Sequence, residues 1–180
     1  ALDWIDKEVT SKDIAIIFMA GHGVNDDKGN YYFLSADANL NKLRRTAVKW
    51  SELQDTIKNL PSKVILLADT CHSGNIMGDR RDITSAIKSI INSGSGSIIM
   101  TATMGSGYSY EQKDWGHGAF TLSFLDGLGK GKADYDNDGA VSIKEIDLYV
   151  TKRVKKLTNG KQKPTTIIPE SVPDFAIGHK

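Results

Sequence analysis

The sequence predicts an α/β fold in which a mostly parallel β-sheet is flanked by helices. Short apolar runs have the length of buried strands, and segments with helical spacing of apolar residues alternate with them. Two of these runs, residues 14–20 and 64–68, are each followed closely by glycine. Ligands of such sheets bind beyond the carboxyl ends of the strands, so a functional site is expected just after these runs.

The first part of the chain alternates between the two patterns. Apolar residues in segment 2–9 share a helical face, and residues 14–20 follow as the first buried strand. After a turn-rich stretch, a short strand is expected at residues 31–34. Helical spacing then covers residues 50–60, and Pro61 ends that helix.

The second part of the chain continues the alternation. We expect strands at residues 64–68, 97–103 and 172–177, and helices at residues 83–91, 120–128 and 142–157. The helix at residues 142–157 has the clearest pattern, because its apolar residues form a single stripe. No internal repeat or linker divides the chain, so a single domain is expected.

Composition excludes several classes of function. The chain has 180 residues, of which 39% are hydrophobic and 25% charged, as in ordinary globular proteins. The net charge of +1 gives no reason to expect a nucleic acid or a membrane as partner. No apolar run approaches the length of a transmembrane helix. The single cysteine rules out an intrachain disulfide and permits a reducing compartment, so a cytoplasmic location is expected.

Cys71 and His22 are the candidate catalytic residues. Cys71 follows the strand predicted at residues 64–68, and His22 follows the strand predicted at residues 14–20. A thiol and an imidazole at the ends of two core strands predict a cysteine nucleophile with a histidine base, which needs no cofactor. The alternatives are a cysteine buried as a small apolar side chain and a histidine that merely occupies a turn.

Other histidines are weaker candidates for the base. His72 should point away from Cys71 if the extended geometry persists, because adjacent side chains alternate across a strand. His117 lies in a predicted loop before a helix and ranks second, whereas His179 is nearly terminal. Acyl transfer also needs donors for the developing oxyanion, and the N–H groups of Gly23 and Cys71 are the natural pair.

Two motifs resemble the signatures of the caspase-like cysteine peptidases. They are Ala20-Gly21-His22-Gly23 and Asp69-Thr70-Cys71-His72-Ser73-Gly74, and the nearest resemblance is to bacterial caspase-family proteins, followed by metacaspases and orthocaspases. The 49-residue separation (71 − 22) agrees with the roughly 50 residues typical of caspases. The similarity continues through residues 31–34, 109–111 and 118–121 and ends near residues 173–175, so it covers nearly the whole chain.

The resemblance implies a caspase-hemoglobinase fold and a Cys71–His22 dyad acting on a protein or peptide substrate. It also implies that Asp69 lines the S1 pocket and favours Arg or Lys at P1, which charge complementarity supports. The alternative for Asp69 is a cap or turn residue at the strand end. Alternative functions are an Asp-specific caspase-like peptidase and a catalytically silent, calcium-responsive scaffold.

The chain departs from the family pattern at its beginning. In the family, a strand, a helix and a second strand normally precede the segment that starts here. Residues 1–180 are therefore expected to form an N-terminally incomplete caspase-like domain. The missing segment or another chain is expected to complete the sheet, because an exposed edge strand needs a cover.

Residues 134–145 match the twelve-residue calcium loop of an EF-hand, with glycine at the sixth position. The candidate metal ligands are Asp134, Asp136, Asp138, Ser142 and Glu145. Such converging oxygens suit a hard divalent ion, so Ca²⁺ is a possible ligand. The alternative is a capped turn, because Ser142 and Glu145 also have the spacing of a helix capping box.

Overall fold

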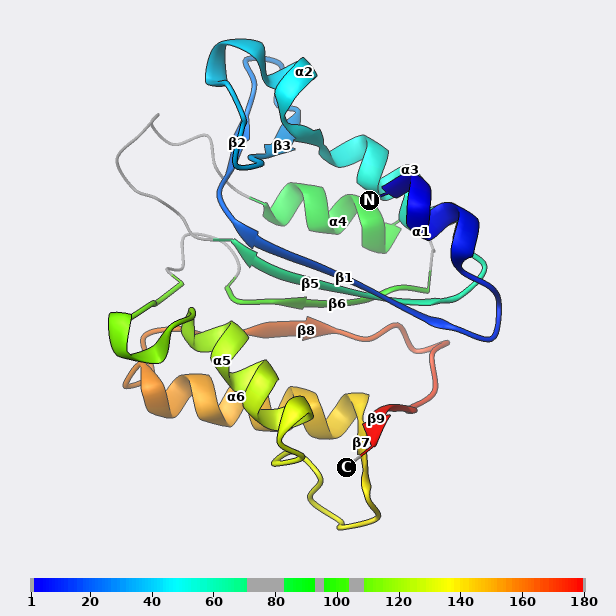
Figure 1. The fold of residues 1–180 in the computed structure, drawn as a ribbon, viewed down its shortest axis with the longest axis vertical. Helices are drawn as coiled ribbons and strands as arrows, with labels where there is room; N and C mark the ends of the chain where they lie inside the picture. Colours follow the sequence, from blue (N-terminus) through cyan, green and yellow to red (C-terminus); the bar gives the residue numbers. More distant parts are fainter. Residues whose placement is uncertain (1, 71–82, 93–95, 104–108, 180) are drawn as a thin grey trace.

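A four-stranded sheet forms the centre of the computed structural model, which describes residues 2–70, 83–92, 96–103 and 109–179 (Figure 1). Its strands, in spatial order, are β1 (Ile14–Gly21), β5 (Lys63–Thr70), β6 (Ile98–Thr101) and β8 (Thr165–Ile167). The first three are parallel, and β8 runs antiparallel to β6. The predicted mostly parallel sheet is therefore confirmed.

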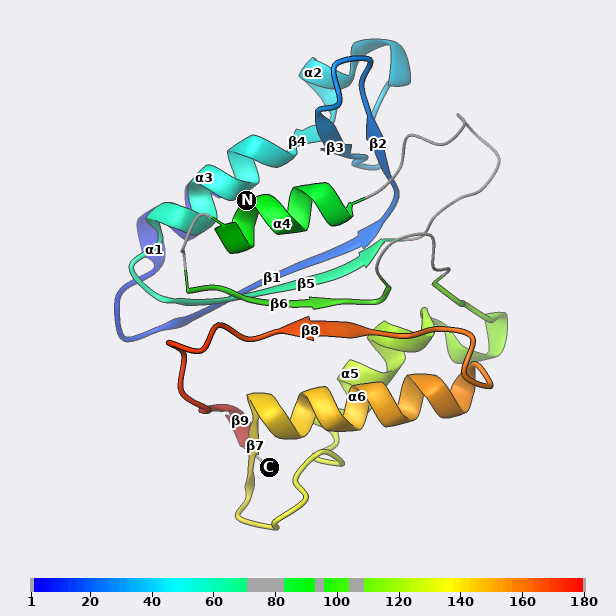
Figure 2. The ribbon, with the colours of Figure 1, turned by 180° about the vertical axis from the view of Figure 1, so that it is seen from behind.

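Helices cover both faces of this sheet (Figures 1 and 2). On one face lie α1 (Leu2–Glu8), α3 (Trp50–Asn59) and α4 (Thr84–Asn92), and on the other lie α5 (Ala119–Gly129) and α6 (Ile143–Leu157). The side chains of β5 alternate between the two faces of the sheet. Leu66 packs in the core beneath α1, α3 and α4, and Ile65 and Leu67 pack in the core beneath α5 and α6. Burial of β5 on both faces explains its nearly continuous apolar sequence.

Smaller elements surround these layers. An antiparallel sheet contains β2 (Gly23–Asn25), β3 (Tyr31–Phe33) and β4 (Val48–Lys49). The short helices are η1 (Leu40–Lys42), α2 (Leu43–Thr46) and η2 (Lys113–Trp115). A two-stranded sheet pairs β7 (Ala140–Ser142) with β9 (Ala176–His179). None of the helices described is both long and apolar enough to cross a membrane.

The end of the chain differs from the sequence-based prediction. The strand expected at residues 172–177 begins only at Ala176, and it pairs with β7 rather than with the central sheet. The strand that does join the central sheet, β8, was not predicted. Its three residues are all half-buried, so they are too few and too similar in exposure to produce an alternating pattern.

The strand β1 forms one edge of the central sheet and presents apolar side chains to solvent. Ile14, Ile16 and Phe18 are 37%, 42% and 48% exposed. Their partners in register include Ile65 for Ile16 and Leu67 for Phe18. Residues paired in this way lie on the same face, so the apolar surface beneath α5 and α6 continues onto the exposed side chains of β1.

Candidate active site

The carboxyl ends of β1 and β5 lie side by side. In the parallel register Ala20 pairs with Asp69 and Gly21 with Thr70. His22 directly follows β1, and Cys71 would directly follow β5. Adjacent strands are about 4.8 Å apart, so the two chain segments leave the sheet as neighbours. Cys71 itself, like the rival base His72, lies outside the described residues.

His22 lines a cavity of about 270 Å³ at this edge of the sheet. The other lining residues are Phe18, Ala20, Gly21, Asp69, Glu111, His117, Gly118 and Thr121. The cavity thus brings together the strand ends, the loop before α5 and the first turn of α5. A larger cavity of about 580 Å³ lies beside β2 and α2, and neither His22 nor Asp69 lines it.

Asp69 is held at the wall of this cavity by two hydrogen bonds. The residue is only 6% exposed, and each of its carboxylate oxygens accepts a hydrogen bond from a different segment of the chain. Ser109 Oγ donates to Oδ1 at 2.8 Å, and Thr121 Oγ1 donates to Oδ2 at 2.6 Å. A buried carboxylate needs such partners, and it can still accept further hydrogen bonds from a ligand.

Glu111 is a second acid in the cavity that the sequence interpretation did not assign. It lies just before η2 and forms an isolated β-bridge with Gly118, which brings the 109–111 segment against the start of α5. Two carboxylates lining one small cavity favour a cationic guest. The only sequence signal was the resemblance of residues 109–111 to the family, because an exposed loop acid has no pattern of its own.

The structure also places the remaining predicted residues. His117 lines the cavity together with His22, so it stays a rival for the base. His179 lies in β9, away from the carboxyl ends of β1 and β5 (Figure 1). Gly23 begins β2 and is buried, and a side chain there would overlap the Tyr31 hydroxyl. Packing alone therefore accounts for this glycine, and its role in an oxyanion hole stays a prediction.

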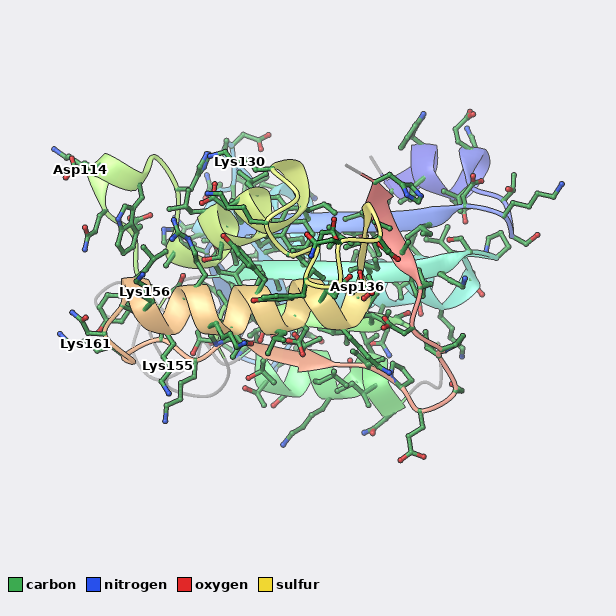
Figure 3. The ribbon with its side chains drawn as sticks, turned by 90° about the horizontal axis from the view of Figure 1, so that it is seen from below. Asp114, Lys130, Asp136, Lys155, Lys156 and Lys161 are labelled. Carbon is green, nitrogen blue, oxygen red and sulfur yellow. The ribbon has the colours of Figure 1, made fainter. Side chains whose placement is uncertain are left out.

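The acidic loop has some features of a cation site and some of a capped turn. Asp134, Asp136 and Asp138 each offer a carboxylate oxygen within 4.8 Å of the others. The other two predicted ligands, Ser142 and Glu145, form the capping box of α6. In Figure 3 Asp136 lies where α6 begins, and Lys155, Lys156 and Lys161 lie toward its other end.

Glu145 closes this loop with backbone hydrogen bonds. Its carboxylate accepts from the N–H of Ser142 at 2.9 Å and from the N–H of Tyr135 at 2.8 Å. The hydrogen bond from Ser142 is the main cause that holds the pKa of Glu145 below its ordinary value. The carboxylate is therefore charged at neutral pH, and its two hydrogen bonds join the two ends of the loop.

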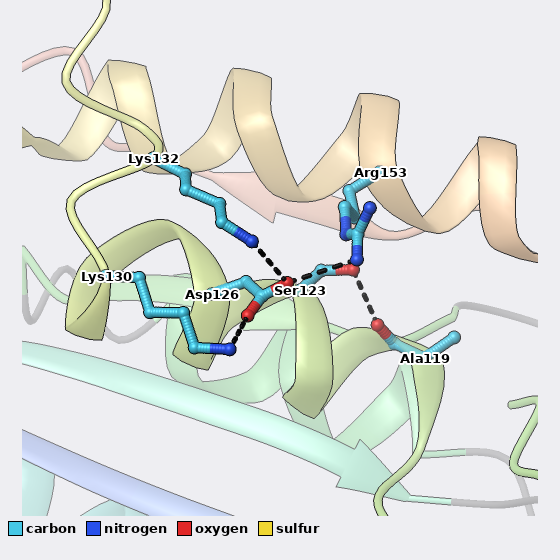
Figure 4. A network of polar contacts seen from close by, with 6 residues as sticks. All are labelled: Ala119, Ser123, Asp126, Lys130, Lys132 and Arg153. Atoms are coloured by element: carbon cyan, nitrogen blue, oxygen red, sulfur yellow. Dashed lines mark hydrogen bonds and ion pairs between the residues drawn. The ribbon is translucent and has the colours of Figure 1, made fainter. Parts of the chain in front are cut away.

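A buried carboxylate on α5 binds the turn that precedes the acidic loop. Asp126 is 3% exposed and forms ion pairs with Lys130, Lys132 and Arg153 at 2.7, 3.2 and 3.1 Å (Figure 4). The hydrogen bond from Lys130 is the largest cause of the lowered pKa of Asp126. These contacts join α5, the turn after it and α6, but none of the four residues lines the cavity beside His22.

Comparisons with known proteins agree with this architecture. Residues 1–171 match the family model described as the caspase domain. A solved structure, the protein GSU0716 from Geobacter sulfurreducens, resembles the chain with a TM-score of 0.54 and 15% sequence identity. The match covers 96% of this chain and 73% of that one, and at this identity it shows the fold alone. No curated protein matches the chain. The family model spans nearly all of the sequence, and the chain belongs to the caspase-domain family of cysteine peptidases.

Proposed function

We propose that this chain is an endopeptidase that cleaves peptide bonds after Arg or Lys with a Cys71–His22 dyad. Membership of the caspase-domain family supports cysteine peptidase chemistry in general. The observation that carries the finer proposal is the position of Asp69, a buried and doubly hydrogen-bonded carboxylate in the cavity that His22 also lines. A guanidinium or ammonium group entering this cavity would meet a fixed negative charge.

The proposed reaction begins with proton transfer from the Cys71 thiol to His22. The thiolate attacks the carbonyl carbon of the scissile bond, and the N–H groups of Gly23 and Cys71 stabilise the oxyanion. The C–N bond then breaks, and the His22 imidazolium gives its proton to the leaving amine. Water, deprotonated by His22, finally hydrolyses the thioester and restores the thiol.

The two carboxylates argue against the Asp-specific alternative. An aspartate side chain at P1 would lie in a cavity lined by Asp69 and Glu111, and like charges in a partly desolvated site repel. Paired fluorogenic peptide amides that differ only in P1 test the proposal. We expect turnover of the Arg and Lys peptides, little turnover of the Asp peptide, and none by Cys71→Ala. Equal turnover of all three peptides would contradict the specificity.

We propose further that Ca²⁺ binds to the acidic loop. The proximity of the Asp134, Asp136 and Asp138 carboxylates supports this, as does the loop sequence. The ion would neutralise these charges and brace the start of α6, and it would take no part in the peptidase chemistry. If the chain binds Ca²⁺ but cleaves no peptide, the scaffold alternative is favoured instead.

We also propose that another polypeptide segment covers the outer edge of β1. The exposed side chains of Ile14, Ile16 and Phe18 support this, because soluble proteins rarely leave a long apolar edge strand open. No described strand pairs with that edge. An added strand would extend the sheet through backbone hydrogen bonds, and its own side chains would flank those of Ile14, Ile16 and Phe18.

A further inference from the structure

Gln162 is one of the most buried polar residues of the molecule, although it lies in a loop. It follows α6 and is 1% exposed. Its backbone N–H donates to Thr158 Oγ1 at 3.1 Å, and that hydroxyl donates to the carbonyl of Val154 at 2.9 Å. The backbone of Gln162 is thus fastened to the last turn of α6, which fixes where its side chain begins.

The side-chain amide of Gln162 joins two segments that border the candidate active site. Its Nε2 donates to the carbonyl of Ala102 at 3.1 Å, and its Oε1 accepts from the N–H of Tyr110 at 2.8 Å. The orientation of the amide follows from chemistry, because a carbonyl only accepts and a backbone N–H only donates. Ala102 in turn donates its N–H to the carbonyl of Ala68 in β5, one residue before Asp69.

The segment fastened by Gln162 carries the wall of the cavity. Ser109, next to Tyr110, donates to Asp69, and Glu111 on the other side of Tyr110 lines the cavity. The carbonyl of Tyr110 accepts from the N–H of Ala119 at 2.7 Å, at the first residue of α5. Two residues later Thr121 supplies the second hydroxyl to Asp69. Both hydrogen bonds that orient Asp69 therefore come from segments in contact with Tyr110.

We propose that Gln162 is a positioning residue for P1 recognition: it fixes residues 109–111 at the end of β6 and thereby sets the place of Glu111 and the orientation of Asp69. It does not line the cavity itself. The inference rests on the proposed function in its use of P1 recognition, whereas the clamp on Tyr110 is a property of the fold. Exchange of backbone amides tests the clamp, and kinetics test its effect on recognition.

Gln162→Met is the informative variant, and Gln54→Met is its matched control. Methionine preserves the length of the side chain but removes both hydrogen bonds of the amide. Gln54 also bridges two segments, because its amide bonds Ser89 in α4 from α3, yet it lies outside the cavity. A general cost of replacing a bridging glutamine should appear in both variants, and a loss of P1 recognition only in Gln162→Met.

Hydrogen–deuterium exchange should show at least about tenfold faster exchange over residues 109–121 in Gln162→Met, relative to β5 in the same sample. Gln54→Met should leave that ratio unchanged. For an Arg peptide we expect kcat/KM to fall about ten- to a hundredfold in Gln162→Met, mostly through KM, because small displacements of a recognition group are costly. Gln162→Glu keeps one oxygen to accept from the Tyr110 N–H, but its second oxygen replaces Nε2 and faces the Ala102 carbonyl without a donor, so the exchange rate should be intermediate.

Wild-type exchange over residues 109–121 in Gln162→Met would overturn the clamp whether or not the protein cleaves peptides. Faster exchange with an unchanged KM for the Arg peptide would overturn the role in recognition. If Gln162→Met does not fold, Gln162→Glu decides, and wild-type exchange and KM in that variant would contradict the proposal. Absence of all turnover in the wild type counts against the proposed function alone, because the exchange result stands without it.

Discussion

Thr121 donates a 2.6 Å hydrogen bond to Asp69 across 52 positions of sequence. The hydroxyl comes from the first turn of α5, and the carboxylate comes from the end of β5. The bond fixes one oxygen of the acid, while Ser109 fixes the other. An acid held in this way has its oxygens at defined places, which the proposed recognition of a basic P1 side chain requires.

Removing either member of the proposed dyad should abolish peptide cleavage. Cys71→Ala removes the nucleophile and His22→Ala removes the base, so each should lower kcat/KM by roughly 10,000-fold or more. Steady-state turnover of an Arg peptide amide measures this, with circular dichroism to confirm folding. His117→Ala is the control for a second histidine in the cavity and should stay within about tenfold of wild type. If His117→Ala abolished cleavage and His22→Ala did not, His117 rather than His22 would be assigned as the base.

Neutralising the acids of the cavity should weaken the preference for basic P1 residues. We expect Asp69→Asn to lower kcat/KM for the Arg peptide about a hundredfold, since a buried charge partner is lost. Glu111→Gln should cost about tenfold, because this acid is exposed and water screens it. Asp114→Asn, which removes a surface charge outside the cavity, is the control (Figure 3). An unchanged ratio of Arg to Asp cleavage in Asp69→Asn would assign the selection to other residues.

A methyl group at Gly118 should disturb the same carboxylate without any change of charge. A Cβ at this position would lie 2.8 Å from Asp69 Oδ2, which is too close unless the acid moves. The backbone angles of Gly118, φ −62° and ψ 153°, suit alanine, so the effect should come from the contact rather than from strain. We expect Gly118→Ala to raise KM for Arg peptides several-fold. Gly129→Ala, at the other end of α5 with no atom near its Cβ, should leave KM unchanged.

Asp126 should contribute stability that depends on pH. Its pKa lies below the ordinary value of 3.8, so the ionised form is favoured by folding, with the Lys130 contact as the main cause. The contribution is present above pH 3.8 and is lost as the pH falls below it. Asp126→Asn should therefore lower the free energy of unfolding by about 1–3 kcal/mol at pH 7. The exposed Lys130 and Lys132 should contribute less to this loss, because water screens their charges. Urea unfolding at pH 7 and pH 3 measures this, and a pH-independent difference would contradict the ion-pair account.

Titration calorimetry with Ca²⁺ decides whether the acidic loop is a metal site. We expect the wild type to bind Ca²⁺ and Asp136→Ala to bind at least about tenfold more weakly, because one of the converging carboxylates is lost. Asp55→Asn removes an exposed acid from α3 and should leave binding unchanged. An absence of heat at millimolar Ca²⁺ would identify the loop as the capped start of α6.

The sequence predicted the strand ends well and the rest of the cavity poorly, for physical reasons. His22 and Asp69 follow apolar runs whose pairing could be anticipated, because parallel strands end at one edge of a sheet. The hydroxyls of Ser109 and Thr121 could not be matched to Asp69, since their hydrogen bonds span 40 and 52 positions and repeat no pattern. The contacts of Gln162 could not be predicted either, because a glutamine in a loop belongs to no periodic pattern. Cys71 lies outside the described residues, so its role stays a prediction.

The edge of β1, which pairs with no other strand among the described residues, also affects how the protein behaves in concentrated solution. A strand of eight residues that exposes Ile14, Ile16 and Phe18 is a template on which any extended chain can assemble, including another molecule of the same kind. Such association would remove free protein by second-order kinetics during concentration or storage, and in an activity assay it would mimic slow inactivation. Turnover per molecule should accordingly be compared over a dilution series. A charged side chain in place of Ile16, which does not line the cavity, should make turnover per molecule independent of protein concentration.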